Sequence, residues 1–423
     1  MNCKVAVTGI GVLSPLGIEL KDHVRALESG QCGTNFKTGF RALFPECCGK
    51  IPDFAVKDYI ENRKIVKIMS RKAVLGYVAA ELSVRDSGIQ NQDIISDEEN
   101  AIIFGNGRSE GITNIKDAII PSITSEGNID YDYLGRKGYR MIPPLWIVQR
   151  LPNTAAGQIS IRHSLKGLNY TVVDESAAGA VSIGEAFICV KDGRSKRAFC
   201  GASEGEIFPD YFWRMKKFGI ASDSENASKA FDINSDGVTL SEGSATLILE
   251  DENSVISRNG KIHGRILSYT NYYIPGFKTD STRQISLNYI KSMKKAVEDA
   301  GININDLNFV QASACGIEKI DRAEALAVKE LFGKKVPVTS SNSSTGYPLA
   351  ASGPISISYA LLQMENGFIA PITRTENFYD DNEINYITGS PVYQDMKYCL
   401  VNCFDYSGGV SSFVLERGKI DNA

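Results

Sequence analysis

TVVDESAAGAVSIGEA, residues 171–186, is the stretch that decides the predicted fold. Its β-branched start, Thr171, Val172 and Val173, predicts a buried strand. Ser176 and the small residues after it predict a turn into a helix whose packing face has only small side chains. Free N–H groups and the positive end of the helix dipole meet at such a turn, which therefore suits a nucleophile or an anionic intermediate. A cysteine thiol at this position would have its pKa lowered by these groups, but the residue here is a serine.

The composition excludes several classes of partner. With 423 residues, of which 43% are hydrophobic, the chain exceeds what one hydrophobic core usually holds, and we expect two core-forming units. The formal net charge is −4, so there is no excess of Lys and Arg to neutralise phosphates. We therefore expect no nucleic acid and no membrane as partner, and we expect proteins or small molecules instead.

The cysteines and histidines indicate neither disulfides nor a metal site. Nine cysteines are present, an odd number without a C-x-x-C pair, and there are only three histidines. We expect no metal and no cofactor, and a reducing, cytoplasmic location. No apolar run reaches membrane-spanning length, and VAVTGIGVLSPLG, residues 5–17, is expected to be a strand and loop rather than a signal peptide.

Local patterns predict further elements along the chain. Residues 4–8 and 101–104 are expected to be strands, and 64–87 is expected to be one long helix that ends at Gly88. Residues 112–144 are polar, rich in aromatic residues and interrupted by prolines. We expect this long irregular segment to form an interface or the wall of a tunnel.

Two parts of the chain are similar to each other. Aligning Gly179 with Gly353 also matches the small residues around them, and SEGSATLILE (241–250) resembles SGGVSSFVLE (407–416). The two offsets agree within ordinary loop variation, which predicts a duplicated α/β unit. Apolar strands buried on both faces, with small-residue helices between two sheets, predict a layered α-β-α-β-α fold.

Six motifs occur in the order VAVTGIGVLSPLG, DESAAGAVSIGEA, AFDINSDGVTLSEGSATLILE, VQASACGIEKIDRAEALAVKELFG, SSNSSTGYPLAASG and VNCFDYSGG. In this order they resemble the successive motifs of β-ketoacyl-acyl carrier protein synthases, which have the thiolase fold. The resemblance spans nearly the whole chain. It implies an N-terminal ketosynthase-like half, residues 1–254, and a C-terminal ketosynthase-like half, residues 255–423.

The resemblance assigns four chemical positions. In active members a Cys takes the acyl chain as a thioester, and two His with a nearby Lys drive decarboxylation of the malonyl extender. The Cys position of T-A-C-x-S-G is Ser176, and the His position of V-N-A-H-G-T is Ser313. In S-T-K-S-M-T-G-H, the Lys position is Asn342 and the second His position is Tyr347. All four groups are replaced, so the resemblance implies that no catalytic residue is intact.

Other positions of the family pattern are retained or changed. Asp321 and Glu324 retain the acidic pair that follows the first His position. The segment Phe404, Asp405, Tyr406 resembles the start of the glycine-rich gate F-G-F-G-G, which lines the acyl pocket. Asp405 replaces a glycine there, which fits a loop that no longer opens for acyl transfer, although a variant turn is the simpler interpretation. The three histidines lie outside all matching motifs: His23, His163 and His263.

Within the superfamily, the pattern resembles the chain-length factor of type II polyketide synthases. The resemblance implies a heterodimer with a Cys-bearing ketosynthase, joined along the central helices and neighbouring strands. This subunit would shape the tunnel for the chain delivered by an acyl carrier protein as malonyl or polyketide groups. Chain-length factors typically have Gln at the position of Ser176, and this chain differs from them there.

Two other functions are compatible with the same residues. One is an acyltransferase or unconventional ketosynthase that loads acyl groups on Ser176 with help from Glu175 or Asp174. The other is a homodimeric acyl-binding module without a synthase partner. Labelling of Ser176 by an acyl carrier protein would favour the first, and absence of a ketosynthase partner would favour the second.

Three further motifs have a structural and a functional interpretation. GASEG (201–205) fits the nucleophile elbow G-x-S-x-G, but we interpret it as a strand that ends in a turn. DINSDG (232–237) resembles the start of a calcium loop, but Glu242 stands at loop position eleven instead of twelve, which favours a turn with local hydrogen bonds. The basic cluster Arg194, Lys196 and Arg197 could dock an acidic carrier protein or be a solvated face.

Overall fold

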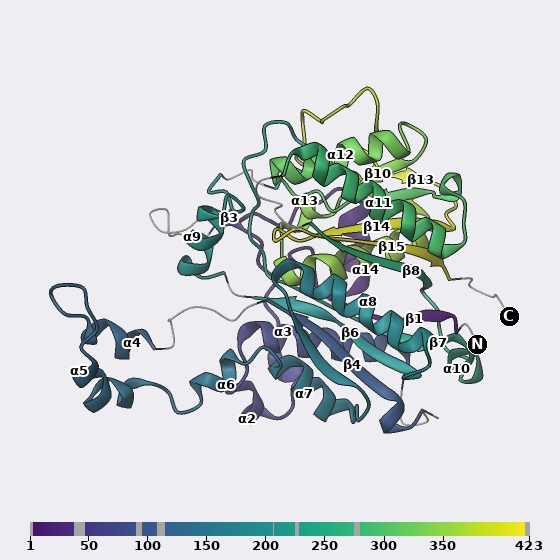
Figure 1. The fold of residues 1–423 in the computed structure, drawn as a ribbon. Helices are drawn as coiled ribbons and strands as arrows, with labels where there is room; N and C mark the ends of the chain where they lie inside the picture. The colour runs from purple at the N-terminus through teal and green to yellow at the C-terminus, as the bar shows by residue number, and fades with distance from the viewer. Residues whose placement is uncertain are drawn as a thin grey trace.

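In the computed structural model, residues 3–37, 47–89, 95–107, 115–205, 207–224, 228–274 and 280–418 are described. Eleven strands in these ranges form one hydrogen-bonded sheet (Figure 1). Their order across the sheet is β12 (Asn385–Tyr386), β10 (Pro337–Thr339), β9 (Phe309–Gln311), β14 (Tyr398–Phe404), β15 (Gly409–Arg417), β8 (Gly264–Tyr273), β1 (Val5–Leu13), β7 (Gly243–Asp251), β6 (Arg197–Glu204), β4 (Asn100–Asn106) and β5 (Asn169–Val173).

The sheet consists of two halves with the same pairing pattern. In one half β1, β7, β6, β4 and β5 follow one another with two antiparallel and then two parallel pairings. In the other half β8, β15, β14, β9 and β10 repeat this pattern. The halves join where Val5 of β1 pairs with Ile266 of β8. The predicted duplication is therefore confirmed, and β7 and β15 contain its two similar segments.

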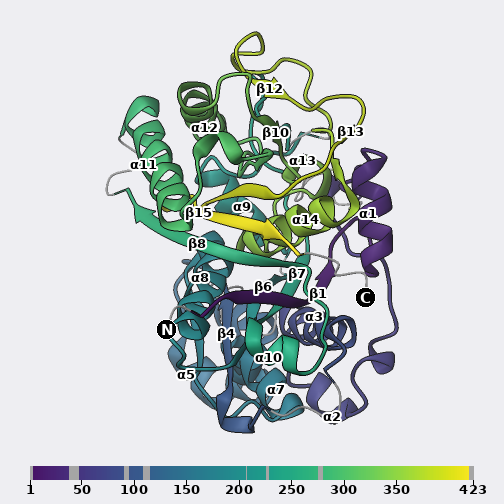
Figure 2. The same cartoon turned by 90° about the vertical axis from the view of Figure 1, so that its right-hand side faces the viewer.

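Helices complete five layers, which are seen most clearly in Figure 2. Helices α3 (Arg71–Ser87) and α7 (Thr154–His163) cover the outer face of the N-terminal half-sheet. Helices α8 (Ala178–Lys191) and α14 (Ser352–Asn366) lie between the two half-sheets. Helix α11 (Thr282–Ala300) lies on the outer face of the C-terminal half-sheet and packs on α12 (Glu318–Leu331). The α/β fold with α-β-α-β-α layers is confirmed.

The two central helices meet at their small residues. A Cβ placed on Gly179 would lie 2.1 Å from the carbonyl oxygen of Ala350 and 2.5 Å from Cδ of Pro354. A Cβ on Gly353 would lie 3.1 Å from the Cβ of Ala180. Only glycine permits this approach, and these are the glycines that align in the duplicated sequence.

Two sequence predictions about these elements are wrong. The strand at 171–173 is half-buried to exposed rather than buried, because β5 is the edge strand of the sheet. The predicted helix 64–87 is broken into α2 (Arg63–Val66) and α3, because the Ser70 side chain caps the start of α3 by accepting from the N–H of Ala73. Gly88 ends α3 as predicted, in the left-handed conformation with φ 64°.

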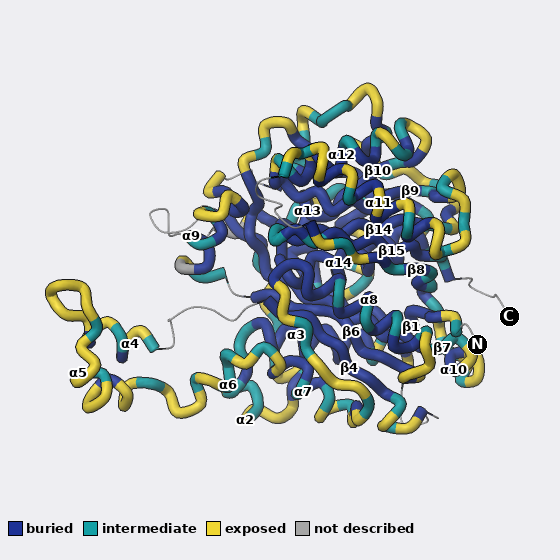
Figure 3. The backbone as a smooth tube through the Cα atoms, viewed as in Figure 1, coloured by how far each residue is buried: buried dark blue, intermediate teal, exposed yellow. Residues whose placement is uncertain are grey.

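Residues 115–150 are largely exposed, and their part with α4 and α5 projects from the body of the molecule (Figure 3). They contain short helices instead of the irregular chain expected: α4 (Lys116–Ile119), α5 (Tyr131–Arg136) and α6 (Trp146–Arg150). Residues 112–114 of the expected segment lie outside the described residues. We call residues 115–150 the arm.

The remaining helices are α1 (Leu20–Glu28), α9 (Pro209–Lys217), α10 (Glu252–Ser257) and α13 (Asn342–Thr345). The boundary predicted between the halves, at residue 254, falls within α10, and the division stays a prediction. In the described part of the chain, no helix combines the length and apolar character needed to cross a membrane.

Candidate functional site

Ser176 lies between the edge strand β5 and the central helix α8. A single 3-10 turn, Glu175–Ala177, connects them, and Glu175 has a positive φ of 36°. Such a backbone conformation is costly for a residue with a side chain and is typical of strained functional turns. Ser176 is only 2% exposed. The predicted turn into the helix is present, and it faces into the protein.

The gate loop, residues 404–409, connects β14 to β15 and contacts Ser176. The Ser176 hydroxyl donates to Oδ1 of Asp405. The N–H of Tyr406 donates to Ser176 Oγ at 3.4 Å. Glu175, one of the acids expected to assist Ser176, instead faces Arg214, with a carboxylate to guanidinium distance of 3.9 Å. The acid that contacts Ser176 is therefore Asp405.

Asp405 is buried and accepts several hydrogen bonds. Its Oδ2 accepts from the N–H of Ser407 at 2.9 Å and from the Ser407 hydroxyl. Burial raises the pKa of Asp405 to about 6, against the opposing effect of the hydrogen bond from Ser176. Removal of a carboxylate from water is unfavourable unless hydrogen bonds compensate, and the serine hydroxyls and the loop N–H compensate here.

The positions of the second His and the Lys are occupied by groups that bind backbone carbonyls. The Tyr347 hydroxyl donates to the carbonyl oxygen of Phe404 at 3.1 Å, so it contacts the gate loop. Burial raises the pKa of Tyr347 far above that of a free tyrosine, so its hydroxyl stays neutral. The Asn342 amide donates to the carbonyl oxygens of Ser313, at 2.9 Å, and Ala314, at 3.3 Å.

Ser313, at the first His position, belongs to a buried hydrogen-bond network. Its hydroxyl lies 2.8 Å from Oε2 of Glu324 and 2.7 Å from the hydroxyl of Tyr289. Glu324 also accepts from the Asn402 amide at 2.8 Å. Burial raises the pKa of Glu324 above its ordinary range. Hydroxyl, amide and carboxyl groups thus surround the position that the family motifs predict for the first His.

The two acids of the retained pair have different surroundings. Asp321 accepts from the backbone N–H groups of Phe231, Cys315 and Gly316, at 2.8 to 3.1 Å. Burial raises its pKa to about 7. Asp321 therefore holds the loop that follows β9, while Glu324 contacts Ser313 itself.

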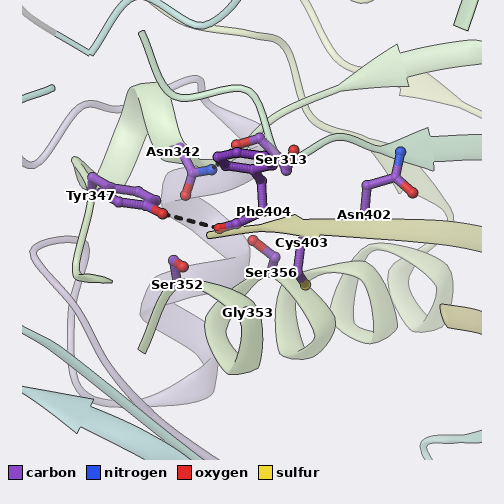
Figure 4. A pocket seen from close by; sticks show the side chains of 9 residues that line it. All are labelled: Ser313, Asn342, Tyr347, Ser352, Gly353, Ser356, Asn402, Cys403 and Phe404. Carbon is purple, nitrogen blue, oxygen red and sulfur yellow. Dashed lines mark hydrogen bonds between the residues drawn. The ribbon is translucent and has the colours of Figure 1, made fainter. Parts of the chain in front are cut away.

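A small polar cavity lies among three of the four predicted positions (Figure 4). Its volume is about 10 Å³, which is near the minimum for one water molecule. The lining is formed by Ser313, Asn342, Tyr347, Ser352, Gly353, Ser356, Asn402, Cys403 and Phe404. In this conformation the cavity has no room for a malonyl group.

A larger cavity of about 270 Å³ has Tyr406 of the gate loop in its lining. It combines apolar side chains with two lysines, and its lining consists of Lys217, Phe218, Gly219, Ile220, Ile317, Lys319 and Tyr406. Sequence analysis missed this cavity, because its residues come from three separate segments. The only local signal is the basic and aromatic run KKFGI at 216–220.

The three histidines make their described contacts with residues other than the four predicted positions. His23 is buried beside Tyr359, with 3.0 Å between its Nδ1 and the tyrosine hydroxyl, and burial lowers its pKa to about 4. His263 lies between the carboxylates of Asp86, at 2.6 Å, and Glu365, at 2.8 Å. His163 contacts Glu81 at 3.2 Å. None of these hydrogen bonds and ion pairs of the imidazoles involves Ser176, Ser313, Asn342 or Tyr347.

The structure also tests the three isolated motifs. Ser203 of the G-x-S-x-G match is fully buried within β6, so it is not at a nucleophile elbow. Asp232 accepts backbone N–H groups of nearby turns, including that of Asn234 at 2.9 Å, as the turn interpretation predicts. Among the residues that the structure describes, no group of three His, Cys, Asp or Glu side chains could hold a metal ion.

The basic cluster at 194–197 is not the single exposed surface that the docking hypothesis assumes, and docking at its exposed residues, Arg194 and Lys196, stays a prediction. Arg197 is 2% exposed and donates to the fully buried Glu250 at 2.7 Å. Lys196 forms an ion pair with Glu99 at 2.8 Å. Because Arg197 belongs to a strand inside the sheet, the three residues do not form one exposed basic surface.

Most of the chain matches two family models. Residues 2–254 match the family described as beta-ketoacyl synthase, N-terminal domain, and residues 276–376 match beta-ketoacyl synthase, C-terminal domain. The chain belongs to the β-ketoacyl synthase family. It is 28% identical to 3-oxoacyl-[acyl-carrier-protein] synthase 2 of Synechocystis sp., over 96% of each chain. It is 26% identical to the synthase 2 of Staphylococcus aureus, over 98% of this chain and 99% of that one.

Solved structures of the β-ketoacyl synthase family share the fold. A beta-ketoacyl synthase from Burkholderia phymatum has a TM-score of 0.85 at 23% identity, and covers 99% of this chain and 100% of its own. The ishigamide ketosynthase/chain length factor has a TM-score of 0.84 at 21% identity, with the same coverage. A type II polyketide ketosynthase, in complex with its acyl carrier protein, has a TM-score of 0.81 at 21% identity. At these identities the likeness concerns the fold alone.

Proposed function

We propose that this β-ketoacyl synthase family member is a catalytically degenerate subunit, a chain-length factor. It pairs with a Cys-bearing ketosynthase in the cytosol and shapes the tunnel that receives the growing polyketide. The main support is the set of contacts made by Ser176, Ser313, Asn342 and Tyr347. These groups bond to the gate loop, to one another and to buried neighbours, and the cavity among them holds about one water.

The chemistry of these groups supports the proposal. An imidazole can exchange a proton near neutral pH, and general acid–base catalysis contributes about two to four orders of magnitude to a rate. Ser313 and Asn342 have no group that titrates in this range, and Tyr347 keeps its proton because burial raises its pKa. Decarboxylation of an extender at this site would therefore lack the two imidazoles and the ammonium group that the family motifs have at these positions.

Two surfaces are suited to a partner subunit. The edge strand β5 exposes Tyr170 and Val173, at 39% and 46%, and its outer side is unpaired within the described sheet. Such an edge favours pairing with another strand. The arm exposes large apolar side chains, which is typical of contact with a second protein: Ile120, Ile123, Tyr131, Tyr139, Met141, Leu145 and Ile147.

We assign the docking of an acyl carrier protein to the cavity beside Tyr406. Lys217 and Lys319 provide positive charge at a site with apolar walls, which suits an acidic carrier protein. The ketosynthase of similar fold that was solved with its acyl carrier protein is consistent with such a partner. This location replaces the cluster at 194–197, which is not exposed as a unit.

Native mass spectrometry of the tagged chain, purified gently from its host, tests the pairing. A one-to-one complex with a Cys-bearing ketosynthase is expected. In the reconstituted complex, replacement of the partner's nucleophilic Cys by Ala should abolish product, whereas Ser176→Ala in this chain should leave the rate within about twofold, since no step uses its hydroxyl. A homodimer alone, or loss of product with Ser176→Ala in an assembled complex, would contradict the proposal.

One observation favours a second candidate, an acyltransferase or unconventional ketosynthase that uses Ser176. The hydrogen bond from Ser176 to Asp405 resembles a nucleophile with its base. Incubation with an acylated carrier protein would then add the mass of the acyl group to the peptide that contains Ser176. The homodimeric acyl-binding module stays a third hypothesis, and the native mass spectrum would distinguish it.

A further inference from the structure

Asp405 forms hydrogen bonds within the gate loop and one hydrogen bond to Ser176. The N–H of Asp405 donates to the carbonyl oxygen of Gly409 at 2.9 Å, and the N–H of Gly408 donates to the carbonyl oxygen of Asp405 at 2.8 Å. The carboxylate accepts from the N–H of Ser407 at 2.9 Å. Its other oxygen accepts from Ser176. One side chain therefore orders the turn and connects it to the N-terminal half of the chain.

The Ser176 hydroxyl makes two bonds with this loop. It donates to Asp405 and accepts from the N–H of Tyr406 at 3.4 Å. Tyr347 adds a third connection, because its hydroxyl donates to the carbonyl oxygen of Phe404 at 3.1 Å (Figure 4). The loop is thus fastened at three successive residues, 404, 405 and 406.

This closed arrangement is unsuited to attack by the Ser176 oxygen. A reacting carbonyl must approach a nucleophile to about 3 to 3.5 Å. Ser176 is 2% exposed, the lining of the larger cavity includes Tyr406 and not Ser176, and the smaller cavity has room for about one water. An acyl thioester could reach Ser176 only if the loop moved.

We propose that the Ser176–Asp405 hydrogen bond is a latch that keeps the gate loop closed and excludes acyl thioesters from Ser176. Asp405 is then a positioning residue that acts through the loop. A glycine at 405 would have no side chain to accept these bonds, so only the connections at Phe404 and Tyr406 would remain. The inference deepens the proposed function, because it explains how an intact hydroxyl at this turn is kept from acyl groups.

Hydrogen exchange of the full chain, followed by mass spectrometry, tests the latch. Ser176→Ala removes only the donor oxygen, and amide exchange in the peptide covering 402–410 should become roughly tenfold faster or more, the change expected for loss of one hydrogen bond to a carboxylate. Ser182→Ala is the matched control. Ser182 is a buried serine of α8, the helix that follows Ser176, and its hydroxyl donates to the carbonyl oxygens of Gly179 and Gly201, away from the gate loop.

Unchanged exchange at 402–410 in Ser176→Ala would overturn the latch. Equally faster amide exchange in Ser176→Ala and Ser182→Ala would overturn it as well. The faster exchange would then be caused by loss of any buried serine hydroxyl in this region and not by loss of the bond to Asp405. Both variants lose one oxygen atom from a buried side chain, so they are expected to fold.

A thiol reporter gives a second measurement. Ser176→Cys places a reactive sulfur behind the loop, and its alkylation by iodoacetamide can be followed on the peptide that contains residue 176. We expect slow alkylation in the single variant and at least about tenfold faster alkylation when Asp405→Gly is added. Equally fast alkylation in both would overturn the latch.

Failure of the latch and failure of the proposed function give different results. The exchange and alkylation experiments use this chain without a partner. Pairing with a ketosynthase is read separately, by native mass spectrometry. A mobile loop in a chain that still forms the one-to-one complex would overturn only the latch.

Discussion

At the scale of single residues, the site is governed by what each buried polar group can donate or accept. Asp405, Glu324 and Asp321 are buried acids, and burial raises the pKa of each. Their neighbours compensate with hydroxyl and N–H donors rather than with basic side chains. The network therefore consists of buried carboxyl groups that are held by hydrogen-bond donors, with no imidazole among the contacts named.

The raised pKa of Asp405 makes stability depend on pH. The folded protein holds this proton up to about pH 6, whereas an unfolded Asp releases it near pH 4. Because the folded state binds the proton more tightly, the stability from this group is greatest below pH 4 and declines by roughly 3 kcal/mol as the pH rises through 6. Urea unfolding between pH 4 and 7.5 should show this decline, and Asp405→Asn should show a flatter profile. Parallel profiles for the two proteins would contradict the assignment.

Restoring a histidine at Ser313 should not restore chemistry. The cavity beside Ser313 has a volume of about 10 Å³, which is too small for an imidazole. Ser313→His should therefore lower the free energy of unfolding by about 1–3 kcal/mol through overpacking. Malonyl decarboxylation, followed by release of CO₂ from a malonyl-carrier protein, should stay at background. Ser313→Ala is the control for the lost bond to Glu324, and activity in the His variant would contradict a filled site.

At the scale of elements, close approach of α8 and α14 explains the glycines that align in the duplicated sequence. The N-terminus of α8 lies against the 3-10 turn Leu349–Ala351, which precedes α14. No side chain fits between the backbones there. The same contact positions Ser176, which lies one turn before α8.

Gly179→Ala should be strongly destabilising. The added Cβ would lie 2.1 Å from the Ala350 carbonyl oxygen, so α8 would have to shift, at a cost of about 1–3 kcal/mol or more. Gly157→Ala is the matched control, because Gly157 is also inside a helix, α7, and a Cβ there meets no atom within 4 Å. The control should be neutral or more stable by up to about 1 kcal/mol. Thermal and urea unfolding measure the stability of both variants. Equal stabilities of Gly179→Ala and Gly157→Ala would contradict the close contact between Gly179 and the Ala350 carbonyl oxygen.

At the scale of the whole molecule, two exposed features are poorly explained by one chain alone. The sheet ends in the edge strand β5, and large apolar side chains of the arm are exposed. The helices α4 and α5 of the arm extend away from the body of the molecule (Figures 1 and 3). Both are suited to a second subunit, which is the basis for the proposed pairing.

A charge on the edge strand should separate assembly from folding. Val173→Lys places an ammonium group on a side chain that is 46% exposed, so unfolding should change by no more than about 0.5 kcal/mol. Pairing along β5 should be lost, and native mass spectrometry should show a single chain. Ile256→Lys is the control that should keep the complex. Ile256 is an exposed residue of α10, which packs on β1 and β7 rather than at the β5 edge. A stable complex with Val173→Lys would place the interface elsewhere.

The sequence by itself determined the fold class and the duplicated halves, because small residues at helical spacing and glycine turns before strands are local patterns. It also determined which side chains stand at the four chemical positions. The predicted strand and the small residues around Ser176 were enough to place this residue near a helix N-terminus. The family motifs extended this prediction to Ser313, Asn342 and Tyr347.

Tertiary structure alone decided which of these groups touch. Ser176 and Asp405 are 229 positions apart, and their contact depends on how two halves pack, which no local pattern encodes. Burial likewise depends on neighbours: β5 was predicted to be buried but lies at an edge, while Arg197 was considered for an exposed surface but lies inside the sheet. The hydrogen bonds between Ser176 and the loop at 405 and 406 are therefore a property of long-range packing, because they join segments that are far apart in the sequence.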